Sequence, residues 1–167
     1  MPEIMCKIDG SELERLIRKY PEISRDVREA KILEALALLE SAVKKGTPYG
    51  AGPIHLRDTV HGKVRVRGQK VTGILGTPME HGMPVEMGTK PHFPPIGPLE
   101  FWVEKKLGIE DEKQARSVAY AIAWKIKRKG TEGKEMFKGG LDENEHRVMS
   151  ILQDIGPEIV RRAGRVS

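Results

Sequence analysis

The segment from Pro91 to Pro98 limits the possible folds of this chain more than any other part of its sequence. It holds four prolines within eight residues. Because proline restricts φ and has no backbone N–H, this segment can form neither a helix nor a central strand. We therefore expect an extended, stiff connection here. A helix is expected directly after it, ending at Gly108, since apolar residues recur at helical spacing between residues 99 and 107.

The clearest helical pattern follows that connection. A helix is expected from residue 110 to just before Gly130, because two leading carboxylates favour the positive end of the helix dipole and cations favour the other end. Apolar residues recur at positions i, i+3, i+4 and i+7 from Ala115 to Ile126. Tyr120 and Trp124 point to the opposite side of this helix, away from its main apolar face.

The N-terminal part of the chain predicts two helices. Ser11 and Glu14 have the spacing of a capping box, so a short helix is expected to end near Pro21. Ser24 is expected to cap a second, long helix that runs to about Lys45.

Glycine and proline punctuate the next block, where three short strands are expected. They are Leu56–Val60, Lys63–Arg67 and Lys70–Leu75. The dipeptide Gly68-Gln69 suits a type II′ hairpin between the last two strands.

Near the C-terminus, residues 131–140 are expected to form a loop around Met136 and Phe137. Asp142 is expected to cap a last helix that Gly156-Pro157 breaks or kinks, and the basic stretch 161–165 is expected to fray.

Together these elements predict an α+β fold with a long N-terminal helix, a small antiparallel β-sheet and C-terminal helices packed on the sheet. The length of 167 residues suits one domain over residues 1–167, because the sequence shows neither a repeat nor a shift in composition. Hydrophobic residues make up 38% and charged residues 32% of the chain, which excludes a disordered tail or a fibre.

Composition also limits the chemistry. Cys6 is the only cysteine, so an intrachain disulfide and a multi-cysteine zinc site are excluded, and an inert thiol in a reducing compartment is expected. No run approaches the roughly 20 apolar residues of a membrane span, and the N-terminus lacks the features of a signal peptide. We therefore expect neither a membrane partner nor secretion.

No catalytic motif is apparent in the sequence. It has no nucleophile elbow, no Walker loop and no GxGxxG phosphate loop, and its five histidines do not have metal-ligand spacing. We expect no cofactor, no metal and no enzymatic activity. A hydrolase built from dispersed residues is a weaker alternative. The histidines are His55, His61, His81, His92 and His146.

The strand Lys63–Arg67 carries cations at alternate positions. Its period of two gathers Lys63, Arg65 and Arg67 on one face and the valines on the other, and Lys70 joins the cations across the hairpin. This pattern is typical of a solvated outer face, and it also suits an anionic partner such as DNA phosphate or an acidic protein surface. Since no aromatic residue is interleaved, base stacking is not indicated.

Two helices carry more apolar surface than one face can bury. Aliphatic residues between 30 and 43, Leu36 and Leu39 among them, spread around the whole helix, and Tyr120 and Trp124 lie behind the main face of theirs. Ordinary core packing is one explanation. Contact between subunits is the other, and we favour it because few elements are available to cover these faces.

Several short motifs stand out in the sequence. They are Val85-Glu86-Met87-Gly88-Thr89, Pro91-His92-Phe93-Pro94-Pro95, Leu99-Glu100-Phe101-Trp102, Tyr120–Ile126, Lys129-Gly130-Thr131 and Met136-Phe137. These motifs resemble the tail-completion proteins of long-tailed bacteriophages, including the putative tail-component family and the minor tail protein Z type of lambda-like phages. In this resemblance a strand ending in Gly-Thr is followed by a Pro-rich turn and a helix, and a later helix ends in a basic stretch, Gly-Thr and an aromatic residue. It covers residues 11–141, with Met87 in place of the usual aromatic, and leaves 142–167 as a C-terminal helical extension.

The resemblance implies a ring-forming structural protein at the joint between phage head and tail. The implied ring is sixfold to match the tail and contacts the tail terminator and the head connector, and DNA passing through it is possible. The implied location is the virion, after assembly in the host cytoplasm. We expect the contacts with subunits and partners at Leu36, Leu39, Glu86, Met87, Gly88, Thr89, Pro94, Pro95, Tyr120 and Trp124. A small cytoplasmic DNA-binding module that uses Lys63, Arg65, Arg67 and Lys70 is the alternative.

Overall fold

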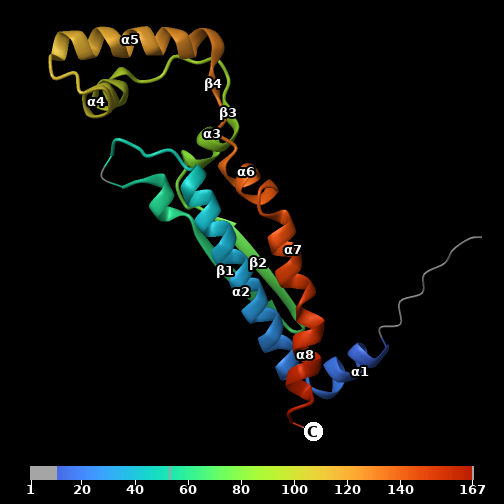
Figure 1. Ribbon diagram of the computed structural model, residues 1–167. Coiled ribbons are helices and arrows are strands. Elements are labelled where there is room, and N and C mark those ends of the chain that lie inside the picture. Colours follow the sequence, from blue (N-terminus) through green and yellow to red (C-terminus); the bar gives the residue numbers. More distant parts are fainter. Residues whose placement is uncertain (1–10, 53, 167) are drawn as a thin grey trace, which may run out of the picture. The chain divides into compact units, whose positions relative to one another are not determined.

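The computed structural model describes residues 11–52 and 54–166 (Figure 1). It confirms an α+β fold with a long N-terminal helix and a small antiparallel hairpin. The prediction for Cys6 lies outside the described residues. In chain order the elements are α1 (Ser11–Lys19), α2 (Pro21–Gly46), the 3-10 helix η1 (Leu56–Thr59), β1 (His61–Arg67), β2 (Lys70–Gly76), α3 (Gly82–Met87), β3 (Gly88–Thr89), α4 (Ile96–Leu107), α5 (Glu112–Lys129), β4 (Thr131–Glu132), α6 (Met136–Asp142), α7 (Glu145–Gln153) and α8 (Ile155–Ala163).

The contacts within the chain divide it into two compact units, each made of separate stretches of sequence. The first unit holds the described residues up to Leu38, then Gly62–Leu75 and the residues from Asn144 onward. The second unit holds Leu39–His61 and Gly76–Glu143. Because both units are discontinuous, no single linker separates them, and the single domain predicted over the whole chain stays a prediction.

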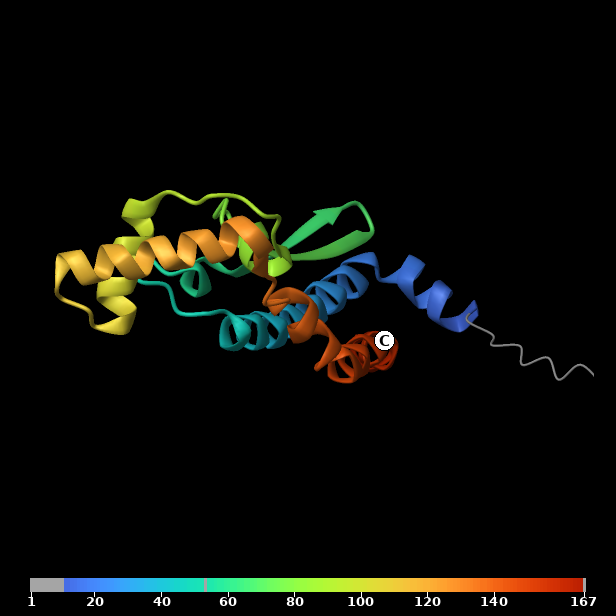
Figure 2. The ribbon, with the colours of Figure 1, turned by 90° about the horizontal axis from the view of Figure 1, so that it is seen from above.

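In the first unit, α2 is the central element (Figure 2). The β1–β2 hairpin lies along one side of α2, and α7 and α8 lie along another side. The predicted packing of the C-terminal helices on the sheet is therefore indirect, since α2 lies between them. Its aliphatic residues occur all round the helix, so α2 can bury apolar surface against neighbours on more than one side.

Two glycines let the hairpin approach α2 closely. A Cβ atom on Gly73 would lie 2.8 Å from Ile32 Cγ2, and one on Gly62 would lie 3.0 Å from Leu36 Cβ. The space that the missing side chains leave is filled by α2, and Leu36 is only 7% exposed. Leu36, which we expected to contact a partner, is therefore a core residue of its own unit.

Gly73→Ala is expected to lower the free energy of unfolding by about 1–3 kcal/mol, because the added methyl group overpacks the contact with Ile32. Gly76→Ala is the matched control on the same strand, since nothing lies within 4 Å of a Cβ atom there. Urea denaturation of both variants measures the difference. Equal stability of the two variants would contradict close packing of the hairpin on α2.

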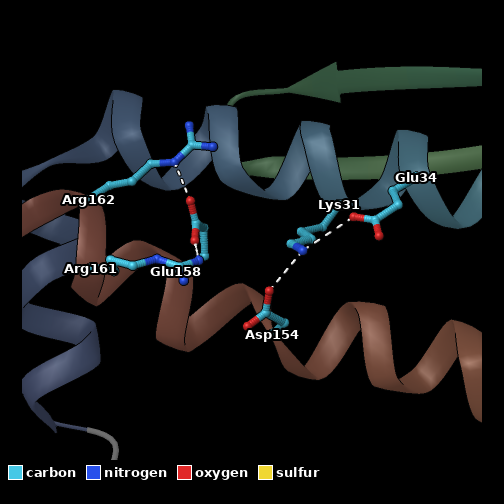
Figure 3. A network of polar contacts seen from close by, with 6 residues as sticks. All are labelled: Lys31, Glu34, Asp154, Glu158, Arg161 and Arg162. Carbon is cyan, nitrogen blue, oxygen red and sulfur yellow. Dashed lines mark hydrogen bonds and ion pairs between the residues drawn. The ribbon is translucent and has the colours of Figure 1, made fainter.

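Lys31 of α2 is bonded to the junction between α7 and α8 (Figure 3). Its Nζ lies 2.8 Å from Asp154 Oδ2 and 3.3 Å from Glu34 Oε2. The hydrogen bonds to Asp154 and Glu34 raise the pKa of Lys31, and the hydrogen bond from Lys31 lowers the pKa of Asp154. The ion pair therefore stabilises the contact of α2 with the C-terminal helices at neutral pH.

Asp154→Asn is expected to destabilise the protein at neutral pH and to have little effect in acid. The contribution of the ion pair is complete above the ordinary aspartate pKa of about 3.9. It is lost as the pH falls through the lower native pKa, because protonation removes the charge of Asp154. Thermal unfolding of both proteins at neutral and acidic pH measures this. A loss of stability that persists undiminished in acid would show that the ion pair is not its cause.

Two N-terminal predictions are corrected. The expected strand Leu56–Val60 is largely the 3-10 helix η1, in which the Thr59 hydroxyl bonds to the carbonyl three residues before and lies 2.7 Å from the Thr77 hydroxyl. Ser24 does not cap α2, because the helix already begins at Pro21 and Ser24 is buried within it. Proline suits the first turn of a helix, where its missing N–H leaves no bond unmade.

Two C-terminal predictions are corrected as well. Asp142, expected to cap the last helix, is the final residue of α6. The basic stretch 161–165, expected to fray, begins within α8. There Glu158 accepts a hydrogen bond from Arg162 at 2.6 Å and pairs with Arg161 (Figure 3), so helical i,i+3 and i,i+4 pairs hold these arginines.

In the second unit, α4 and α5 pack against each other as a helical hairpin. The two helices predicted after the Pro-rich segment are confirmed, although α4 begins earlier than expected, at Ile96. Gly108 ends α4 in the left-handed region, and Asp111 caps α5 by accepting the Gln114 N–H at 2.7 Å. The fully buried residues between the helices are Val103, Ala115 and Ala119.

Candidate interaction surfaces

The two Gly-Thr pairs of the sequence, Gly88-Thr89 and Gly130-Thr131, lie side by side in the structure. β3 pairs antiparallel with β4, so that Gly88 is opposite Glu132 and Thr89 is opposite Thr131. The Thr131 hydroxyl accepts the Thr89 backbone N–H at 3.0 Å and lies 3.0 Å from the Thr89 hydroxyl. We call this pairing the Gly-Thr crossing. The sequence marks both pairs as motifs but does not reveal that they meet.

Glycine is required on both sides of the Gly-Thr crossing. Gly88 has φ 75° and ψ −174°, and Gly130 has φ 70° and ψ −158°, a region essentially restricted to glycine. A Cβ atom on Gly88 would meet the Thr131 carbonyl oxygen, and one on Gly130 would meet that of Thr89. The two backbones are thus in direct contact where the chain enters and leaves the α4–α5 hairpin.

Gly88→Ala is expected to lower the free energy of unfolding by about 3 kcal/mol or more, because a backbone clash adds to a strained φ. Gly108→Ala is the matched control: its φ is also positive, at 66°, but nothing lies within 4 Å of a Cβ atom. There only the left-handed strain of about 1–2 kcal/mol is expected. Chemical denaturation measures both, and equal losses would mean that strain alone matters at residue 88.

Glu86 connects the Gly-Thr crossing to α6. Its carboxylate accepts hydrogen bonds from the backbone N–H groups of Phe137 at 2.9 Å and Lys138 at 3.1 Å. A carboxylate at this helix end satisfies free donors and interacts favourably with the helix dipole. The loop predicted over residues 131–140 is therefore wrong from Met136 onward, because a cap supplied by a distant residue starts a helix there.

Met87 lies next to the crossing and is 75% exposed. The resemblance implies a strand that ends in Gly-Thr. The structure has such a strand in β3, but it covers only Gly88 and Thr89, and Met87 before it is the last residue of α3. Met83, one helical turn earlier, lies on the same face and is also exposed.

An exposed aromatic cluster lies on α5 and on the segment before α4. The rings of Phe93 and Trp124 meet edge to face with centroids 5.8 Å apart, and Lys127 Nζ lies 4.4 Å from the centroid of the Trp124 ring. Tyr120 lies one turn before Trp124 on the same face. Trp124 is 50% and Tyr120 39% exposed. We call Phe93, Tyr120, Trp124 and Lys127 the aromatic cluster. Helical periodicity indicates Tyr120 and Trp124, whereas Phe93 and Lys127 join them only through the fold.

The other predicted contact residues are less exposed or lie in the backbone. Pro95 is exposed as the residue before α4, while Pro94 and Leu39 are half-buried. The structure thus gathers Glu86, Gly88 and Thr89 at the Gly-Thr crossing, and Tyr120 and Trp124 in the aromatic cluster.

The four predicted cations are exposed on the β1–β2 hairpin, and we call them the cationic strand face. They are Lys63, Arg65, Arg67 and Lys70. The alternate residue Gly62 contacts Leu36 of α2, so the alternation of the strand turns the cations away from that side. Within the described part of the chain, none of these four side chains takes part in an ion pair or a hydrogen bond.

Arg28 of α2 anchors the turn of this hairpin. Its guanidinium donates hydrogen bonds to the carbonyl oxygen and Oε1 of Gln69, the latter at 2.8 Å, and to the Ser24 carbonyl oxygen at 3.0 Å. Gly68 has φ 57°, which the first position of a type II′ turn requires. The sequence predicts the turn but gives no sign of its contact with Arg28.

A groove of about 490 Å³ lies between α2 and α7. Its polar side chains are all exposed, so the groove lacks the buried polar groups that orient a small ligand. Among the described residues, no three His, Cys, Asp or Glu side chains are placed to hold a metal ion, and no helix is long and apolar enough to cross a bilayer. The residues that line the groove are Glu34, Leu38, His146, Arg147, Ser150 and Ile151.

No protein family, no curated protein and no solved structure matches this chain. Its function is therefore inferred from the aromatic cluster, the Gly-Thr crossing and the cationic strand face.

Proposed function

We propose that the protein is a structural, non-enzymatic component of a phage particle. It acts as a tail-completion or neck protein that joins the tail to the head connector as a closed ring, sixfold to match the tail. Its partners are further copies of itself, the tail terminator and the head connector. Its place is the head-tail junction or upper tail of the virion, after assembly in the host cytoplasm.

The exposed aromatic cluster carries this proposal. The chain has two tryptophans, and both are substantially exposed, Trp102 at 39% and Trp124 at 50%. Aromatic residues are enriched in the cores of protein–protein interfaces, where burying them contributes much of the binding energy. A contact of this surface with a different surface of the next copy repeats around an axis and forms a closed ring when the rotation closes.

The Gly-Thr crossing supports the same proposal. The motifs around residues 88–89 and 130–131 carry the resemblance to tail-completion proteins, and in three dimensions they form a single feature. Two short motifs that meet in one structural joint support each other more strongly than two unrelated matches along a sequence.

A small DNA-binding module is the alternative function, favoured by the cationic strand face. The two functions make different demands on the protein. A ring protein must associate with copies of itself or with tails, whereas a DNA-binding module can act as a monomer.

Mass measurement in solution, together with negative-stain imaging of the protein mixed with purified tails, tests the proposal. We expect an oligomer of defined copy number in solution or a ring at the end of the tail. A protein that stays monomeric and never joins tails would overturn it.

Trp124→Ala is expected to weaken self-association or tail binding at least tenfold, because it removes the centre of the aromatic cluster. The stability of the dilute monomer should change by less than about 1 kcal/mol, since the side chain is half exposed. Analytical ultracentrifugation and thermal unfolding measure the two effects.

Val103→Ala is the control for this variant, because Val103 is fully buried between α4 and α5. It should lower stability by about 2 kcal/mol and leave the association of the folded protein unchanged. A Trp124→Ala variant that loses as much monomer stability as Val103→Ala would place Trp124 in the core instead.

A further inference from the structure

We infer that the cationic strand face binds the phosphate backbone of duplex DNA without reading its sequence. This binding needs only the folded chain, so it does not depend on the ring proposed above.

The charges of this face have no partner within the described structure, in contrast to other cations of the chain. Lys31, Lys44 and Lys138 each have a carboxylate oxygen within 3.0 Å. The sequence between Asp58 and Glu80 holds no acidic residue. The hairpin therefore carries no carboxylate of its own that could neutralise Lys63, Arg65, Arg67 or Lys70.

The arrangement of these cations is unfavourable without an anion. In a hairpin with a two-residue turn, Arg67 and Lys70 lie directly opposite each other, and like charges in that position repel. An anionic partner would replace this repulsion by attraction.

The spacing of the cations suits a linear polyanion. Alternate residues of a strand lie about 6.8 Å apart, so Lys63, Arg65 and Arg67 span about 14 Å, the axial length of about four phosphates on one DNA strand. By the same two-residue turn, Thr72 lies opposite Arg65 on this face and is itself an exposed polar residue. Duplex DNA presents such a regular line of charge whatever its sequence, which favours DNA as the partner.

The face is also held in place before any partner binds. The packing of Gly62 and Gly73 on α2 supports the strands from behind, and the hydrogen bonds of Arg28 hold the turn. A strand backbone that is already fixed loses less conformational entropy on binding than a flexible one. Because the exposed side of the hairpin has no aromatic residue to stack on bases, the binding is expected to depend on phosphates alone.

Fluorescence anisotropy with short DNA duplexes of two unrelated sequences tests the inference. If all four cations neutralise phosphates, the slope of log affinity against log salt is about −3.6, a loss of ~150-fold between about 50 and about 200 mM salt. Both sequences should bind with the same affinity. The triple variant K63Q/R65Q/R67Q should lose most of this slope and bind more than tenfold more weakly at low salt.

The variant K113Q/K125Q/K129Q is the matched control. It removes the same charge from three exposed lysines of α5 and should change the affinity by less than threefold. Circular dichroism and thermal unfolding of both triple variants establish that they are folded. The single variant R65Q should reduce the slope by about 0.9, which a variant that merely unfolds would not do.

Several outcomes would overturn the inference. They are the absence of salt-dependent binding by the natural protein, a clear preference for one DNA sequence, and an equal loss of affinity in the control variant. Polyglutamate that competes as well as DNA of equal charge would assign the face to an acidic protein instead. Ring formation and tail binding are measured without DNA, so the proposed function can fail while this inference holds, and the reverse.

Discussion

The direct contact of two backbones at the Gly-Thr crossing is the constraint on which the second unit depends. Because Gly88 and Gly130 have no side chains, each can approach the carbonyl oxygen of the threonine on the facing strand. The crossing brings the chain back, after α5, to the place where it left for α4. It also places Glu86 at the start of α6, where its carboxylate bonds to two backbone N–H groups. The positions of α3, α6 and the ends of the α4–α5 hairpin thus all depend on this close approach of the two backbones.

The first unit uses missing side chains in a different way. Because Gly62 and Gly73 have no side chains, α2 packs closely against the hairpin. Leu36 and Ile32 of α2 occupy the space that those side chains would fill. Much of the apolar surplus of α2 is therefore covered within the chain. The surplus on α5 is not, since Trp124 remains half exposed, and for this reason we propose the aromatic cluster as the contact surface.

The two exposed surfaces differ in the forces that would act on them. Association through the aromatic cluster depends on removing apolar area from water, which simple salts do not screen. Phosphate binding by the cationic strand face releases counterions and weakens steeply as salt rises. A change in ionic strength would therefore separate the two proposed activities in one protein, and substitutions at Trp124 and at Arg65 are expected to act independently.

The sequence by itself determined the helices whose patterns are long and regular, the turn at Gly68 and the alternation of Lys63, Arg65 and Arg67, because these depend on neighbours a few residues away. Only the tertiary structure decided which glycines lie in a crossing, where α6 begins, and that Leu36 is covered while Trp124 is not. Those outcomes depend on contacts between distant residues, such as Glu86 with Phe137 and Gly130 with Thr89. Local periodicity carries no information about such contacts, since they arise only when the chain folds back on itself.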